Sequence, residues 1–313
     1  MKKYNLLLII LVYILSINLV LAQNSNTLSS ISSVDASSEI KVGIYIISIG
    51  KFDVGSGAFT ADFYLSLKCD STCPNQDFEF MNGRASSLDK IVDEPNEKFY
   101  RIQANLASPI DLKQFPFDKQ QIQIVLEDKK NTVDKVRYVV DSEGTGMDES
   151  VVITGWQMGE YDVEVKEHYY SIYDETYSQY VFTIPIYRII LNAIIKTLLP
   201  IFFIITVMLS SFILDPDKLS TRIAMVSSAL VASVMFHVSL ANQIPPVGYL
   251  TFMDKFMVLT YFVILISFAL NVMLMELTEL KKTDLVNKIH TKTGYSVLVI
   301  VPILYALLFW LFL

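Results

Sequence analysis

The sequence is poor in the residues that build metal centres and covalent active sites. Its 313 residues include 2 cysteines and 3 histidines, and His168, His237 and His290 lie in unrelated segments. Covalent catalysis needs a nucleophile beside a base, and a zinc site needs several Cys or His ligands at short spacing. Neither pattern occurs, so the sequence predicts no enzyme, no metal site and no cofactor.

An excess of basic charge is also missing. The chain has 25 Lys and Arg against 32 Asp and Glu, a net charge of −7. Residues 23–187 hold 14 basic and 26 acidic residues, whereas residues 188–313 hold 9 and 6. Nucleic-acid binding depends on neutralising phosphates with Lys and Arg, so nucleic acid is not a predicted partner. An acidic exterior instead concentrates cations near it.

The N-terminus carries the features of an export signal. Lys2 and Lys3 precede an apolar run from Leu6, and small or aliphatic residues end it before Gln23. We predict a secretory signal peptide over residues 1–22; the alternative is an uncleaved first membrane span. Under either interpretation the region that follows is exported. It begins with a Ser- and Asn-rich leader over residues 23–38.

The two cysteines, Cys69 and Cys73, lie in a turn-like Cys-Asp-Ser-Thr-Cys-Pro stretch. Exported domains fold in oxidising compartments, where close cysteines pair. We therefore predict a small disulfide-closed loop.

Between Glu39 and Arg188 the dominant hydrophobic period is two. In the segment Phe59–Leu67 every odd position is apolar, and the segments Tyr161–Lys166 and Tyr180–Ile186 alternate in the same way. Short alternating strands separated by turn signals are typical of an antiparallel β-sandwich. We predict an all-β, immunoglobulin-like sandwich as the extracellular domain, residues 23–188.

Residues 189–313 contain four apolar segments long enough to span a bilayer at 1.5 Å per residue. We predict a four-helix transmembrane bundle with helices at about 189–214, 219–241, 254–276 and 294–313. Four lysines place the 280–293 loop in the cytoplasm by the positive-inside rule, which puts the β-domain outside. The expected location is the plasma (inner) membrane, multi-pass, with the N-terminal domain extracellular or periplasmic.

The second span is unusual because small and hydroxylated residues recur along it at steps of three and four, the spacing of one helix face. This stripe comprises Thr221, Ala224, Ser228, Val231, Met235, Val238 and Asn242. Around a central axis, it would line a pore with an apolar constriction at Val231 and Met235 that excludes ions by dewetting. The alternative is a small-residue seam between packed helices. His237 lies off the stripe, either as a proton sensor or as a neutral partner of a neighbouring helix.

Charged and rigid residues gather in the sequence where the domain meets the membrane. The turn Phe115-Pro116-Phe117-Asp118 has an acidic tip, a second turn carries Asp53, and Arg188 begins the first span. An arginine between two carboxylates can form a charge-assisted cluster linking sandwich and helices. The alternative is a set of unrelated solvated charges.

Several motifs together point to a known family. They are Gly43-Ile-Tyr-Ile, Phe59-Thr-Ala-Asp-Phe-Tyr-Leu-Ser-Leu, Ser108-Pro-Ile-Asp-Leu-Lys-Gln-Phe-Pro-Phe-Asp-Lys-Gln, Thr154-Gly-Trp156, Arg188 before the first span, Leu199-Pro200 within it, and Ile244-Pro-Pro-Val-Gly-Tyr-Leu-Thr251 after the second. In this order, over roughly residues 40–275, the chain resembles a pentameric ligand-gated ion channel of the Cys-loop receptor superfamily, in its short prokaryotic form.

The resemblance implies a homopentamer around the second span, with ligand sites between neighbouring sandwiches. It implies that Asp53, Asp118 and Arg188 couple the domains, that the loop from Pro245 to Tyr249 receives the motion, and that Val231 is the hydrophobic gate. The chain departs from the family at Ser108 and Ile122, which replace the namesake disulfide, and in the stretch 68–80, which lacks a Trp-x-Pro segment.

The segment from His168 to Gln179 is the candidate ligand-contacting hairpin. Aromatic faces beside carboxylates suit a cationic ligand, although tyrosines are also ordinary strand residues. The candidate ligand-binding residues are Tyr170, Tyr173, Glu175 and Tyr177, with Tyr138 and Arg101 as further candidates.

The sequence thus predicts a ligand-gated ion channel in membrane lipid, opened by a small extracellular, cationic ligand. Asp215, Asp217 and the acidic exterior favour cations as permeating ions. One alternative is a channel of the same fold gated by protons, and another is a non-conducting, membrane-anchored receptor.

Overall fold

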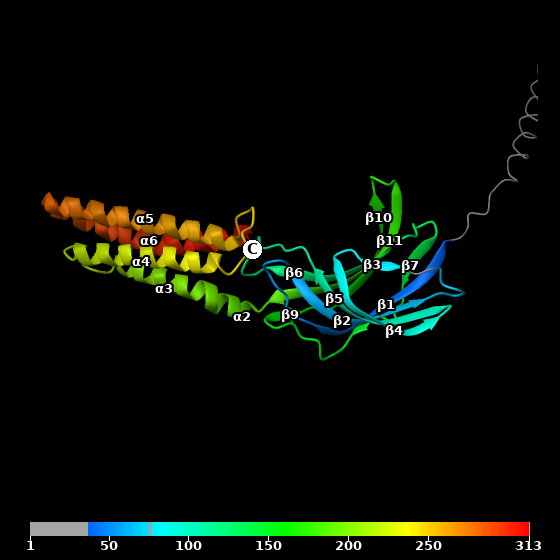
Figure 1. The fold of residues 1–313 in the computed structure, drawn as a ribbon. Helices are drawn as coiled ribbons and strands as arrows, with labels where there is room; N and C mark the ends of the chain where they lie inside the picture. Colours follow the sequence, from blue (N-terminus) through cyan, green and yellow to red (C-terminus); the bar gives the residue numbers. More distant parts are fainter. Residues whose placement is uncertain (1–36, 75–76, 313) are drawn as a thin grey trace, which may run out of the picture.

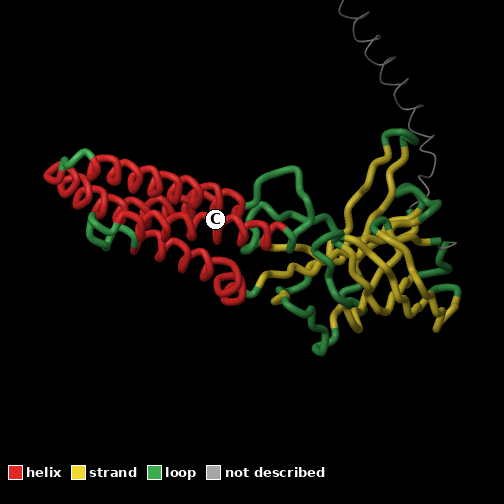
Figure 2. The backbone as a smooth tube through the Cα atoms, turned by 60° about the vertical axis from the view of Figure 1, so that its left-hand side comes forward, coloured by secondary structure: helices red, strands yellow, loops and turns green. Residues whose placement is uncertain are grey.

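The computed structural model describes residues 37–74 and 77–312 as a β-domain joined end to end to a helical bundle (Figure 1). The molecule is elongated, with all the strands in one half and the long helices in the other (Figure 2). The predicted signal peptide, residues 1–22, lies outside the described residues.

The described strands form two sheets. One has the order β4-β5-β2-β1-β7 with β8 beside β1, and the other has the order β10-β11-β6-β3 with β9 beside β11. The bounds are β1 (Ser38–Ile49), β2 (Ala58–Lys68), β3 (Phe78–Phe80), β4 (Gly83–Glu94), β5 (Glu97–Ala107), β6 (Lys119–Asp128), β7 (Val136–Val140), β8 (Gly146–Met147), β9 (Trp156–Met158), β10 (Asp162–Tyr170) and β11 (Glu175–Arg188).

The alternating pattern of the sequence sets which side chains fill the core. On β2, the odd-numbered residues from Phe59 to Leu67 are all buried. They pack in one cluster with Ile124 of β6 and Phe182 of β11, which belong to the opposite sheet. Burying apolar area at this density is the main stabilisation of such a sandwich.

Strand β11 links the two halves of the molecule. It pairs with β6 from Gln179↔Glu127 to Tyr187↔Lys119, and with β10 in a long hairpin that projects from the sandwich (Figures 1 and 2). Arg188 ends the strand and helix α2 begins at Ile190. With so short a connection, the position of the sheet constrains the start of the bundle.

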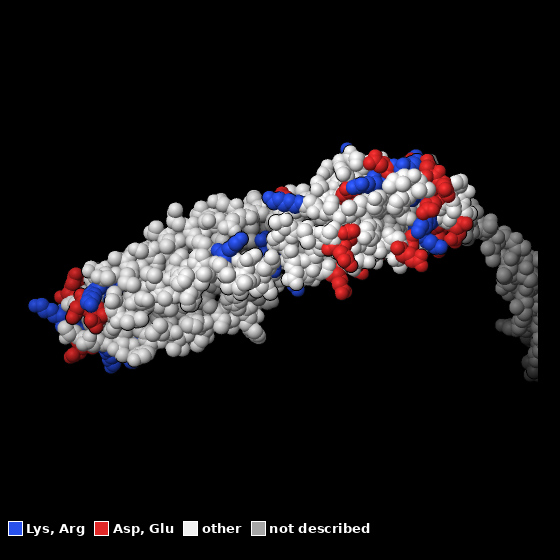
Figure 3. All heavy atoms as spheres, turned by 90° about the horizontal axis from the view of Figure 1, so that it is seen from below, with Lys and Arg blue, Asp and Glu red and all other residues white. Residues whose placement is uncertain are grey.

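The helical half consists of α2 (Ile190–Ala193), the π-helical segment η1 (Ile194–Leu198), α3 (Leu199–Ser210), α4 (Leu219–Ala241), α5 (Phe252–Glu279) and α6 (Thr283–Phe312). Four helical stretches are long and apolar enough to cross a membrane, the first running from Ile190 to Ser210. The predicted sandwich followed by four membrane helices is confirmed. The chain is a multi-pass membrane protein with an extracellular N-terminal domain, and its helical half is largely free of charge between its two ends (Figure 3).

Two predicted helix boundaries differ from the structure by more than three residues. Helix α6 begins at Thr283 rather than 294, so most of the expected cytoplasmic loop is helical. Polar residues there do not break a helix, and 30 residues exceed what the roughly 30 Å hydrocarbon core requires, so one end can extend into water. The first span ends at Ser210 rather than 214, and a turn follows.

Candidate functional site

Helix α4 presents its predicted stripe away from the rest of the chain. All seven stripe residues are exposed, with Val231 at 63% and Met235 at 69%. The opposite face packs into the bundle through Val226, Ala229 and Leu240. The stripe is therefore not a packing seam within one chain, and it is available to line a space between chains.

His237 faces a neighbouring helix rather than the stripe. Its Nδ1 lies 2.9 Å from the Tyr261 hydroxyl and its Nε2 lies 3.3 Å from Asp254 Oδ1, both on α5. Asp254 also accepts hydrogen bonds from the backbone N–H and hydroxyl of Thr251, closing a capping box at the start of α5. This histidine links α4 to the outer end of α5.

An ion pair forms the centre of the domain junction. Arg188 Nε donates to Asp118 Oδ1 at 2.6 Å, and Gln120 Nε2 donates to Asp118 Oδ2 at 2.7 Å. The Asp118 side chain is 1% exposed, so its charge depends on these partners. The Arg188 guanidinium lies 4.9 Å from the Phe115 ring centre and 4.7 Å from that of Trp156. Arg188 thus contacts one carboxylate and two aromatic rings.

The loop after α4 bonds directly to the turn that carries Asp118. The backbone N–H of Leu112 donates to the Tyr249 hydroxyl at 2.8 Å, and the N–H of Phe252 donates to the Lys113 carbonyl at 2.7 Å. Phe117 contacts Phe252, with ring centres 6.0 Å apart. The turn is therefore connected directly to the start of α5 and to the preceding loop.

Not every residue predicted at the junction joins the ion pair. Asp53 bonds within its own turn, accepting from the Ser56 hydroxyl at 2.5 Å and from the Gly55 N–H at 3.2 Å. These hydrogen bonds, Ser56 first, lower the pKa of Asp53. Among the described residues, Asp53 has no ion pair with Arg188, although its neighbour Val54 packs against the bundle. Pro245 is half-buried in the loop after α4.

A cavity of about 300 Å³ lies beside the turn end of the β10–β11 hairpin. It is lined by four of the candidate ligand-binding residues, Tyr170, Tyr173, Glu175 and Tyr177, together with Glu79, Glu127, Asp128 and Lys129. The lining thus combines four carboxylates, one lysine and three aromatic rings, a composition that favours a small organic cation.

Two carboxylates of this cavity, Asp128 and Glu127, are only 2% exposed, and Glu127 contacts three polar side chains. Its Oε1 accepts from the Tyr170 hydroxyl at 2.9 Å, and its Oε2 lies 3.0 Å from Gln179 Nε2 and 3.1 Å from His168 Nδ1. Burial, aided by the bond to Glu127, raises the pKa of Tyr170 to about 12. Tyr170 therefore stays protonated at neutral pH and acts as a donor to the carboxylate.

Tyr138 and Arg101 lie elsewhere in the β-domain. Tyr138 is 3% exposed within the sandwich core, where burial raises its pKa well above the usual value. Arg101 is on β5 in the other sheet and pairs with Asp62 at 3.0 Å. Within one chain, the structure does not bring either residue to the cavity.

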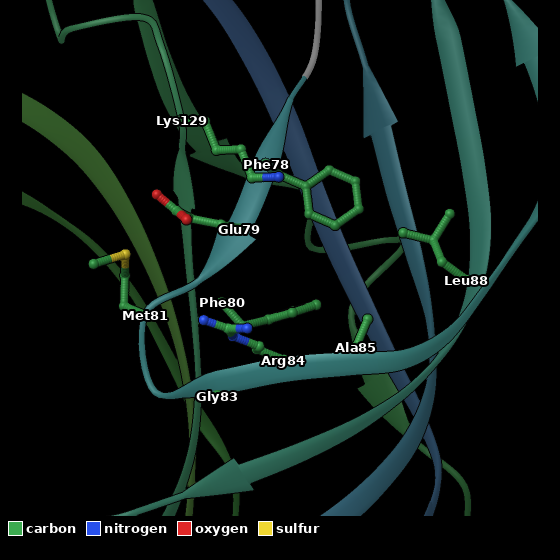
Figure 4. Close-up of a pocket in the computed structure, with 9 residues that line it drawn as sticks. All are labelled: Phe78, Glu79, Phe80, Met81, Gly83, Arg84, Ala85, Leu88 and Lys129. Atoms are coloured by element: carbon green, nitrogen blue, oxygen red, sulfur yellow. The ribbon is translucent and has the colours of Figure 1, made fainter.

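A second, larger groove of about 600 Å³ adjoins the first and shares Glu79 and Lys129 with it. Phe78 and Leu88 border this groove, and Arg84 lies near Phe80 at the start of β4 (Figure 4). On the neighbouring β2–β3 connection, the structure contains a disulfide between Cys69 and Cys73.

No known family model matches the sequence. The chain is similar to a curated proton-gated ion channel of Gloeobacter violaceus, with 25% identity over 161 residues. The resemblance to the pentameric ligand-gated ion channels is confirmed. The match covers 51% of this chain and 44% of that protein, so it spans less than half the length of the relative. That relative is an ion channel rather than an enzyme, in agreement with the lack of a catalytic motif.

Proposed function

We propose that this protein is a ligand-gated ion channel formed by five copies of the chain, with α4 lining the pore. The main support is the α4 stripe, which runs the length of a membrane helix and stays exposed while the opposite face is buried. A lipid-facing surface has no need of Thr221, Ser228 and Asn242. Five stripes around an axis would give polar mouths and an apolar ring at Val231 and Met235.

We expect the motion caused by ligand binding to pass through the domain junction to the gate. A ligand that binds the open arrangement more tightly shifts an existing equilibrium towards it. Motion of the sandwich would reach the Asp118 turn through Arg188, which continues from β11. It would pass to the loop after α4 through the bond between Leu112 and Tyr249. That loop would then move the outer end of α4 and widen the Val231 ring.

The cavity beside the turn end of the β10–β11 hairpin is the proposed ligand site, and a small organic cation is the proposed ligand class. The acidic surface would also favour cations as permeating ions, with Asp215 and Asp217 near the inner mouth. In a pentamer a neighbouring chain would close the open side of the cavity, and Arg101 would be available there.

Replacing Glu127 by Gln removes the buried charge but keeps an acceptor for Tyr170. We expect affinity for a cationic ligand to fall by at least about fivefold, because unit charges 4 Å apart interact by about 1 kcal/mol even in bulk water. Concentration–response curves for a panel of amines would measure this. Glu164→Gln, an exposed glutamate on β10 beside Lys166, is the matched control and should leave the curve unchanged. Equal curves for Glu127→Gln and wild type would rule out a charge contact with the ligand.

Protons are the second candidate ligand, since the Gloeobacter relative is a proton-gated channel. His168 Nδ1 lies 3.1 Å from Oε2 of Glu127, so a second titratable group contacts a carboxylate that lines the cavity. If acid alone opens the channel and amines have no effect, protons are the ligand. If amines open the channel at constant neutral pH, protons are not the ligand.

Two-electrode recording from cells that express the chain alone tests the channel itself. Currents evoked by pH steps or amines, with reversal potentials measured in altered sodium and chloride, would establish conduction and selectivity. A non-conducting receptor would give no current although the chain reaches the surface. In that case cysteines introduced as Ala224→Cys, Ser228→Cys and Val231→Cys would not react with water-soluble reagents, whereas in a channel they should.

A further inference from the structure

A third cavity, of about 160 Å³, lies where β11 passes into the first membrane helix. Its polar lining comes from Arg188, Asn192, Lys196, Thr197 and Gln243. Among the described residues no carboxylate lines it, so the cavity combines two cationic side chains with amides and a hydroxyl. Such a lining is complementary to an anion.

Arg188 has hydrogen-bonding capacity left for a ligand in this cavity. A guanidinium carries five N–H donors, and only the Nε donor is used on Asp118. Among the described residues, its terminal nitrogens have no hydrogen-bond partner, and the side chain remains 25% exposed. An anion could therefore bind the terminal nitrogens without displacing Asp118.

Lys196 is a cation within the first membrane-spanning helical stretch. In the described part of the chain, no carboxylate lies within ion-pair distance of it, and the helical stretch from Ile190 to Ser210 contains no acidic residue. An ionised side chain in a membrane segment normally pairs or reaches the headgroup region. Lys196 lies in the π-helical segment η1, and such segments occur frequently at functional sites.

The position of the cavity relative to the membrane indicates which class of anion could bind there. The cavity lies at the outer end of the first span and includes the exposed Ile189 in its lining; Ile190, Leu191 and Ile194 of the same segment are exposed as well. A lipid whose chains rest on these residues would bring its headgroup to the level of Arg188 and Lys196. At this depth an anion attached to acyl chains is available from the membrane itself.

We propose that this cavity binds the phosphate of an anionic phospholipid in the outer half of the bilayer. Lys196 and the terminal nitrogens of Arg188 neutralise the phosphate, and the side-chain amides of Asn192 and Gln243 donate to its oxygens or to the headgroup. The bound lipid bridges β11, the first span and the end of α4. Lipid binding does not require ion conduction, so this site can be tested independently of the proposed channel function.

The test uses the full-length purified protein in neutral detergent, with lipid binding measured by native mass spectrometry. Dioctanoyl phosphatidylglycerol is the probe, and dioctanoyl phosphatidylcholine and inorganic phosphate are the comparisons. We expect phosphatidylglycerol to bind more tightly than phosphatidylcholine. Lys196→Gln should weaken its binding by about fivefold, the contribution of one basic side chain near an anionic membrane surface. Lys196→Arg should retain the binding.

The matched control is Lys255→Gln, a lysine near the outer end of α5 that lies over the Phe312 ring and outside this cavity. It should leave phosphatidylglycerol binding unchanged. Equal losses in the two glutamine variants would overturn the site, as would equal binding of the two lipids by wild type. If inorganic phosphate competes as well as the lipid does, the ligand is a free anion. If Lys196→Gln lowers the number of chains in the assembly but not lipid binding, the anion is a neighbouring chain's carboxylate.

Discussion

Val231→Ser is expected to open the channel at ligand concentrations at least about tenfold lower than wild type, and to give current without ligand. A serine ring holds water where a valine ring expels it, so the variant stabilises the wet, open state in every chain at once. A change of 1.4 kcal/mol in the opening equilibrium suffices for a factor of ten. Concentration–response curves and the leak current before ligand measure both effects.

The same helix offers a control for this substitution. Val234 is also exposed on α4 but lies off the stripe, so Val234→Ser makes the same chemical change away from the proposed constriction. Its curve should stay close to that of wild type. If Val231→Ser gates like wild type, the constriction lies elsewhere along α4.

Arg188→Gln should abolish most of the evoked current while leaving ligand binding intact. The substitution leaves Asp118 buried without its counter-ion, and breaking a buried pair costs about 3–5 kcal/mol. Gln also lacks the planar cation that lies between Phe115 and Trp156. Surface labelling, ligand binding and recording on the same cells would separate lost coupling from lost expression.

Arg137→Gln is the matched control for the junction. Arg137 pairs with Glu167 at 3.3 Å, but both side chains are more than half exposed, and such pairs contribute at most about 1 kcal/mol. We expect nearly normal currents from this variant. If Arg188→Gln impairs binding and current equally, the arginine supports the fold of the sandwich rather than coupling. Arg188→Lys, which keeps the charge but not the stacking, would then show which of the two contacts matters.

The sequence was most informative where one simple period governs the structure. On β2, alternation alone identified the buried residues from Phe59 to Leu67. On α4, helical spacing alone selected a stripe that is exposed throughout. Periodicity is reliable here because each element buries one face and exposes the other.

The ligand cavity was harder to predict because it is assembled from distant strands. The hairpin tyrosines could be identified from their clustering, but Glu79 and Glu127 come from β3 and β6. Glu127 and Asp128 end strand β6, whose even-numbered residues are buried; Glu127 is buried against this period, which alternation in the sequence does not reveal. Tyr138 was misleading because a strand tyrosine looks the same in the core as in a binding site.

Contacts across the junction were predictable in part. Arg188 forms the expected ion pair with Asp118 of the acidic turn. The Asp53 carboxylate instead accepts a hydrogen bond from Ser56 in its own turn, and this depends on a turn geometry that the sequence does not specify. Residues 283–293 show the limit of hydropathy, which detects where a helix leaves the apolar layer but not where the helix itself ends.

The disulfide between Cys69 and Cys73 has a consequence for handling the protein. The backbone N–H groups of both cysteines bond to the turn between β4 and β5, at Asn96 and Pro95, so the small ring fastens one loop to another. A ring this short adds only about 2 kcal/mol in the chain-entropy treatment. Thiol reductants in a purification buffer should therefore loosen this corner without unfolding the sandwich, and samples prepared with and without them are not equivalent.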